Sequence, residues 1–78
     1  MKPTIGTIVI YHCNEEEEKK NNFQKDAPAV ITAVWGENCV NLKVLLDGIE
    51  NLWKTSCVEA SGENCWSWPV IDWPVIEP

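Results

Sequence analysis

The side chains with the clearest capacity for covalent chemistry are one histidine, His12, and four cysteines. Nucleophilic catalysis needs a general base held beside the nucleophile. Cys13 follows His12 directly, but consecutive residues of a strand point to opposite faces, so these two side chains are not expected to meet. A Cys–His pair would need Cys39, Cys57 or Cys65 instead, and nothing in the sequence selects one of them.

Other signatures of a reaction centre do not occur in the sequence. It has no Gly-rich phosphate loop, no HExxH motif and no paired carboxylates outside an acidic run. No CxxC pair supports a zinc site, and an irregular metal site from His12, Cys13, Cys57 and Cys65 is an alternative to free, buried thiols, which we expect. We therefore predict a protein that is not an enzyme and that needs no cofactor or metal.

Several residues are suited to binding rather than to catalysis. Aromatic rings stack on flat rings such as nucleobases, and an asparagine side chain can make two contacts with a base edge. A lysine and neighbouring hydroxyls can hold a phosphate. The candidate ligand-binding residues are Tyr11, Trp66 and Trp68 for stacking, Asn41 for a base edge, and Lys54, Thr55 and Ser56 for a phosphate. The alternative is that the tryptophans cap the open ends of a small barrel.

Charge narrows the class of partner. The formal net charge is −6, and the chain has no arginine. Binding to duplex DNA or RNA needs a stripe of Lys and Arg, and so does binding to an anionic membrane surface. We therefore expect neither partner. No apolar run is long enough for a membrane span, and the N-terminal residues do not resemble a signal peptide, so we expect a cytoplasmic protein.

The elements that position these residues are predicted to be short strands. Runs of β-branched and alternating apolar residues end at Gly, Asn, Asp or Pro, with turn signals about every ten residues. In the third run, Val40, Leu42, Val44 and Leu46 share one face. We expect an all-β fold, a five-stranded SH3-like small barrel, with strands over residues 7–12, 27–35, 39–46, 53–58 and 65–68.

Two further segments flank or interrupt this barrel. Residues 14–26 contain four consecutive glutamates and are expected to form a flexible, solvated acidic loop inside a barrel domain of residues 1–69. Residues 70–78 are expected to form an extended apolar tail, rich in Trp and Pro, because Trp68-Pro-Val-Ile recurs as Trp73-Pro-Val-Ile. A core this small and an apolar tail together favour a homo-oligomer.

An ordered series of motifs resembles a family of small phage proteins. The series is Pro3-x-Ile5-Gly6-x-Ile8-Val9-x-Tyr11, Ala29-x-Ile31-x-x-Val34-Trp35, Val40-Asn41-Leu42-x-Val44-x-x-Asp47-Gly48 and Trp66-x-Trp68-Pro69. It covers roughly two thirds of the chain. Members of the family often carry His between the last two tryptophans, where this chain has Ser67.

The resemblance implies a phage-encoded SH3-like barrel. The chain also looks like the small oligomeric phage sponges that sequester nucleotide signals of bacterial immunity in the host cytoplasm during infection. Such sponges bind cyclic dinucleotides such as cyclic GMP-AMP, or cyclic ADP-ribose derivatives, without cleaving them. Two alternatives stay open: a protein-interaction module that inhibits or recruits a host protein, and a phage structural accessory protein.

Overall fold

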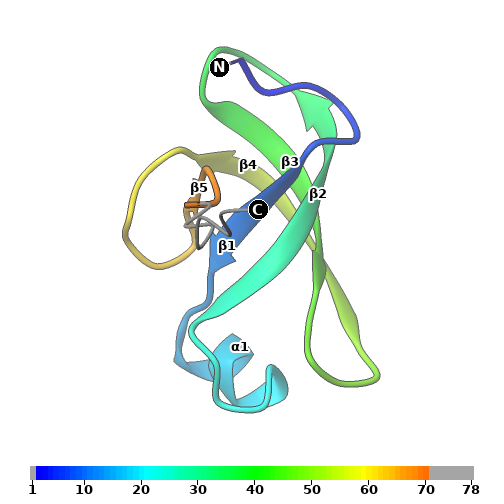
Figure 1. Ribbon diagram of the computed structural model, residues 1–78, viewed down its shortest axis with the longest axis vertical. Helices are drawn as coiled ribbons and strands as arrows, with labels where there is room; N and C mark the ends of the chain where they lie inside the picture. Colours follow the sequence, from blue (N-terminus) through cyan, green and yellow to red (C-terminus); the bar gives the residue numbers. More distant parts are fainter. Residues whose placement is uncertain (1, 71–78) are drawn as a thin grey trace, which may run out of the picture.

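Five antiparallel strands form one strongly curled sheet (Figure 1). The computed structural model describes residues 2–70. In chain order the elements are β1 (Ile8–His12), α1 (Glu15–Lys20), β2 (Asp26–Val34), β3 (Cys39–Leu45), β4 (Asn51–Val58) and β5 (Trp66–Ser67). The order across the sheet is β4-β3-β2-β1-β5. The prediction of a small all-β barrel is confirmed, and every strand lies within two residues of its expected bounds.

The curl of the sheet brings its two ends together beyond β4. Glu59 forms an isolated parallel bridge with Trp66 of β5. The backbone N–H of Ala60 donates to the carbonyl of Trp66 at 3.0 Å. The indole Nε1 of Trp66 also donates to the backbone carbonyls of Asn38 and Cys57, at 3.0 and 3.2 Å. These contacts attach the short strand β5 to the far end of the sheet.

The concave side of the sheet carries the core. Alternation along β3 buries Val40, Leu42 and Val44 completely, as its two-residue period predicts. Pro28, which has no N–H to donate, lies in β2 just before Ala29, the first residue of that strand paired with β3. The other fully or almost fully buried apolar residues are Val9, Tyr11, Cys13, Ala27, Ala29, Ile31, Leu46, Cys57 and Trp66.

The strand residues that alternate with the core positions lie on the convex side of the sheet. Strand register places Trp53, Lys43, Val30 and Ile8 in one row across four strands. Ile10 lies in the next row, opposite Ser67 of β5. We call this side the outer face.

The acidic segment differs from its prediction. Residues 14–26 were expected to form a flexible, solvated loop, but they contain α1, which closes one end of the curled sheet (Figure 1). Asn14 caps the helix: its side chain accepts from the backbone N–H of Glu17, and the Glu17 carboxylate accepts from the backbone N–H of Asn14. Glu17 is buried, so one residue of the acidic run belongs to the interior.

The structure bears on two more expectations, the C-terminal tail and the absence of a membrane span. Apart from Val70, the predicted C-terminal tail lies outside the described residues. Within residues 2–70, no helix has the length and apolar character needed to cross a bilayer.

Candidate functional site

Two of the three predicted stacking residues belong to the core. Tyr11 and Trp66 are both 0% exposed. A ring without an exposed face cannot stack on a ligand, so these two residues are corrected to structural roles. Trp68 is half-buried, and its ring meets Trp66 edge to face at 5.2 Å between centroids. Five tryptophans in so small a chain suggested exposed rings, but burial depends on which strand face each residue occupies.

Lys54 is also placed differently from its prediction. Its ammonium lies 2.7 Å from Oε2 of Glu17 and 5.7 Å from the centre of the Tyr11 ring, on the concave side of the sheet. The expected phosphate-binding group of Lys54, Thr55 and Ser56 is therefore split, because neighbouring strand residues point to opposite faces. The ammonium already neutralises a buried carboxylate and is not free to meet a ligand.

The other three predicted residues do come together. Asn41 lies in β3 and is buried, and its Oδ1 accepts from Thr55 Oγ1 at 3.1 Å and from the backbone N–H of Ser56 at 2.9 Å. The Nε1 of Trp35 donates to the same oxygen at 2.9 Å. We call Asn41, Thr55, Ser56 and Trp35 the Asn41 cluster.

Two irregularities of the sheet build this cluster. The register of β2 against β3 shifts between Ile31 and Ala33, and that of β4 against β3 shifts between the partners of Val40 and Leu42. Ser56 adopts a φ of 55°, an uncommon conformation for a residue other than glycine. Bulges on both neighbouring strands thus turn the backbone N–H of Ser56 toward Asn41.

The cluster has a donor left for a ligand. Within residues 2–70, no acceptor takes a hydrogen bond from Nδ2 of Asn41, whereas its Oδ1 already has three donors. The predicted two-point contact of Asn41 with a base edge is therefore reduced to donation from Nδ2. The amide orientation follows from the three donors around the oxygen.

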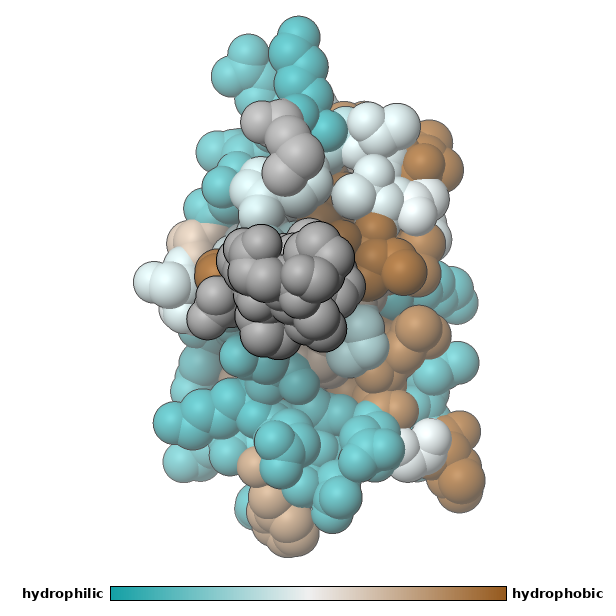
Figure 2. All heavy atoms as spheres, viewed as in Figure 1, coloured by the Kyte–Doolittle hydropathy of each residue, from teal (hydrophilic) through white to brown (hydrophobic). Residues whose placement is uncertain are grey.

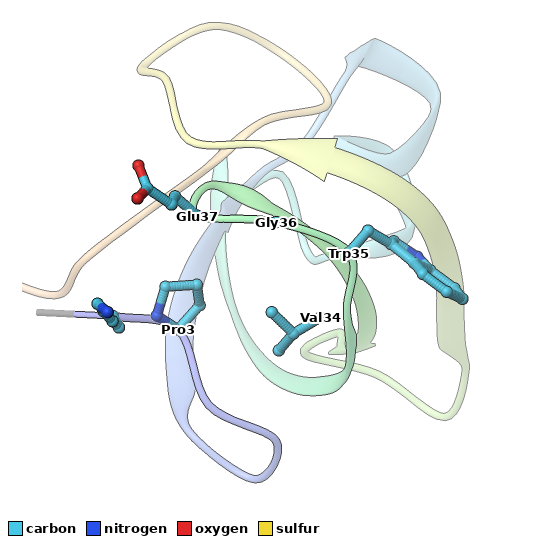
Figure 3. Close-up of a pocket in the computed structure, with 6 residues that line it drawn as sticks. Pro3, Val34, Trp35, Gly36 and Glu37 are labelled. Atoms are coloured by element: carbon cyan, nitrogen blue, oxygen red, sulfur yellow. The ribbon is translucent and has the colours of Figure 1, made fainter.

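Trp35 supplies an aromatic surface that the sequence analysis did not select. Its side chain is 65% exposed, although its Nε1 is hydrogen-bonded, so the ring is held by one edge and open on its face. The indole extends toward β4, while Pro3 and Val34 lie on the other side of the same segment (Figure 3). A concavity of about 410 Å³ there is lined by Lys2, Pro3, Val34, Trp35, Gly36 and Glu37.

Two buried cysteines and the buried Tyr11 are poorly suited to act as nucleophiles or to lose a proton. Burial raises the pKa of the Cys13 thiol to about 11, and it also raises the pKa of Cys57, with Lys54 partly opposing the rise. Both thiols are therefore protonated at neutral pH and are poor nucleophiles. Burial and the hydrogen bond to Glu17 raise the pKa of Tyr11 far above its usual range.

Glu17 is ionised despite its position. Burial by itself would raise the pKa of this carboxyl, but the hydrogen bonds from Lys54, from the backbone of Asn14 and from Tyr11 outweigh that effect and lower it. Tyr11 donates to Oε1 at 2.7 Å. The charge of Glu17 thus ties α1 to β4 and β1.

The four cysteines and His12 do not assemble a metal or thiol site. All four thiols are unpaired, and no group of three metal-ligating side chains converges within residues 2–70. The ring nitrogens of His12 instead contact Asp26 and Ser67.

No family model, no curated protein and no solved structure matches the chain.

Proposed function

We propose that this protein binds a small nucleotide ligand at the Asn41 cluster and holds it without cleaving it. The observation that carries the proposal is an open indole face at Trp35 beside Nδ2 of Asn41, which has no hydrogen-bond acceptor within residues 2–70. Trp35 itself donates to Oδ1 of the same side chain. A flat ring stacked on Trp35 would gain about 1–3 kcal/mol. Nδ2 would then donate to a ring nitrogen or carbonyl at the edge of the ligand.

Contacts for a phosphate come from the same side of the sheet. Thr55 and Ser56 present hydroxyls 3.3 Å apart beside Asn41. Lys43 is exposed, shares the outer face with Asn41 and stands opposite Trp53. Because exposed charges farther than about 8–10 Å are largely screened, local lysine and hydroxyl contacts can act despite the net charge of −6.

The case for binding without cleavage rests on the chemistry of the cluster. The cluster holds only indole, carboxamide and hydroxyl groups, none of which ionises near neutral pH and none of which can act as a general base. The resemblance to phage barrels that sequester immune signals extends the proposal to its biological form: a trap that lowers the free concentration of a cyclic dinucleotide or a cyclic ADP-ribose derivative in the infected cell. A nanomolar trap needs about −12 kcal/mol of binding.

Calorimetry against a panel of cyclic dinucleotides and cyclic ADP-ribose isomers tests the proposal. We expect binding of one panel member, and the ligand should be recovered intact by chromatography. Trp35→Ala should weaken binding roughly 5- to 150-fold, the loss of one stacked base. Phe23→Ala, which also removes an exposed ring, should bind as the wild type.

A second variant removes the amide donor and places a negative charge beside the proposed phosphate contacts. Asn41→Asp keeps oxygens to accept from Trp35, Thr55 and Ser56 but removes the Nδ2 donor. We expect the fold to persist and binding to fall about tenfold or more, since a ligand acceptor would lose its partner. Absence of heat with every panel member at high protein concentration would overturn the nucleotide assignment.

The outer face favours a second candidate function, contact with another protein. Ile8 is 56% exposed and Trp53 58%, at the two ends of one cross-sheet row. Exposed apolar surface of this kind marks interaction sites. In this alternative a host protein, rather than a second copy of the chain, would cover the outer face and be recruited or inhibited there. Capture from host lysate with wild type and Trp53→Ala separates this function from ligand binding at Trp35.

A further inference from the structure

Three polar side chains from three strands form a hydrogen-bonded chain on the outer face. Oδ1 of Asp26 in β2 lies 2.8 Å from Nδ1 of His12 in β1. Nε2 of His12 lies 2.9 Å from Oγ of Ser67 in β5. The sheet builds this chain, because His12 pairs with Asp26 in the register, and Ser67 stands opposite Ile10, two residues before His12 on the same face.

The chemistry of the partners assigns the protons. An ionised Asp26 only accepts, so a neutral His12 carries its proton on Nδ1. Nε2 then presents a lone pair, and the hydroxyl of Ser67 donates to it. A serine hydroxyl donating to a histidine that a carboxylate orients is the arrangement that activates a nucleophile. The His12 side chain is 18% exposed, so the group can be reached from solvent.

The hydrogen-bonded side chains of Asp26, His12 and Ser67 border a concavity with largely apolar walls. Its volume is about 390 Å³, and its apolar walls are Ile10, Trp68, Pro69 and Val70. His12, Asp26 and Ser67 supply the polar part of the lining. The edge-to-face contact with Trp66 holds the Trp68 ring in place. An apolar acyl or aryl group would fit against these walls.

We propose that Ser67 is a nucleophile that accepts acyl groups from small apolar esters, with His12 as its general base and Asp26 as a positioning residue. Ser67 Oγ forms a bond to the carbonyl carbon as its proton passes to His12 Nε2. The bond from that carbon to the ester oxygen then breaks, and the proton leaves with the alcohol. A water molecule then attacks the acyl carbon as one of its protons passes to His12 Nε2. The bond from that carbon to Ser67 Oγ breaks, and His12 returns the proton to Ser67, which yields the acid and the free serine.

This site is separate from the proposed nucleotide site. Asp26 begins β2, whereas Trp35 follows its last residue, so the two sites lie at opposite ends of that strand. Failure at one site therefore leaves the other untouched. On this proposal, the prediction that the protein is not an enzyme would hold for the Asn41 cluster alone.

Labelling with an alkyl fluorophosphonate, a serine-directed probe, tests the proposal on the intact chain. We expect one adduct by mass spectrometry, mapped to Ser67 and abolished by Ser67→Ala. His12→Gln should slow labelling about 10²-fold or more, the usual contribution of a general base. Ser61→Ala, which removes an exposed loop serine, should label as the wild type.

Further variants separate activation from folding. Imidazole in solution should restore labelling of His12→Ala. Asp26→Asn should label about tenfold more slowly or worse, and Asp26→Glu, which keeps a carboxylate, should retain more of the rate. Asp26 is exposed, so both variants should unfold at the wild-type temperature. No adduct on the wild type, an adduct on another serine, or equal rates in the wild type and His12→Gln would overturn the proposal.

Discussion

At the scale of single residues, Asn41 shows how much one side chain can organise. Its Oδ1 accepts from a side-chain indole, a hydroxyl and a backbone N–H at the point where both neighbouring strands are irregular. Backbone groups left without partners at a bulge are costly when buried. Asn41 therefore has a structural role as well as the proposed contact with a ligand.

Asn41→Ala should destabilise the protein by about 1–3 kcal/mol, because the three donors lose their acceptor. Urea unfolding followed by tryptophan fluorescence measures the change. Asn51→Ala, at an exposed position at the start of β4, is the matched control and should change stability little. Equal effects of the two substitutions would contradict the role assigned to Asn41.

The lowered pKa of Glu17 predicts that the stability of the fold depends on pH. Its pKa is lowered in the folded protein, so its stabilisation is present above the pKa of the unfolded chain, about 4.3. That stabilisation is lost as the pH falls through the lower, folded pKa. Glu17→Gln should cost about 2 kcal/mol at pH 7, since Lys54 loses a charged partner.

Urea midpoints measured from pH 7 to pH 3 test this prediction. The gap between wild type and Glu17→Gln should narrow as the pH falls. Glu16→Gln is the control, because Glu16 is exposed in the same helix. A gap that does not change with pH would show that Glu17 acts through shape alone.

At the scale of elements, α1 shows how a short helix can form within a charged run. Six residues are too few for a stable isolated helix. The capping box between Asn14 and Glu17 satisfies backbone groups at its start, and Glu17 ties it to Lys54 and Tyr11. Tertiary contacts, rather than helix propensity, hold the segment in place.

Asn14→Ala should therefore lower stability by about 1 kcal/mol through loss of the cap. It also removes the donor to Oδ1 of Asn64, which lies 3.0 Å from Asn14 Nδ2. Thermal unfolding measures the effect, with Glu16→Ala as a control in the same helix. If both variants unfold at the wild-type temperature, the capping box contributes nothing measurable.

At the scale of the whole molecule, apolar surface is unevenly distributed. In Figure 2 hydrophobic residues gather on one side of the viewed face, whereas the end near α1 is mostly hydrophilic. The outer face contributes Ile8, Leu45 and Trp53, each more than 40% exposed. A domain of this size buries little apolar surface by itself, so covering this face would stabilise it.

We expect the outer face to pair with a second copy of the chain. Trp53→Glu should shift the solution mass, measured by light scattering, toward the monomer, because a charge would be buried at the contact. Ile49→Glu introduces the same charge at a fully exposed position in the loop between β3 and β4, and it should leave the mass unchanged. A wild-type protein that is strictly monomeric at high concentration would contradict the expectation.

Local patterns in the sequence were sufficient to predict the positions of the strands. The period of two along Val40, Leu42 and Val44 and the turn residues at Gly36 and Asp47-Gly48 predict strand positions, because both depend on neighbouring residues. The signal for α1, Asn14 three residues before Glu17, was also present, but the run of glutamates favoured a solvated loop.

The composition of the candidate sites was decided by tertiary structure. Tyr11 and Trp66 are buried, and Lys54 is paired with Glu17, because these residues lie on the concave side of a curled sheet. Bulges and strand register bring Trp35 to Asn41, and they bring His12 to Asp26 and Ser67. Register and curl arise from contacts between residues distant in sequence, so spacing along the chain determines the strands of this protein but not which side chains meet across them.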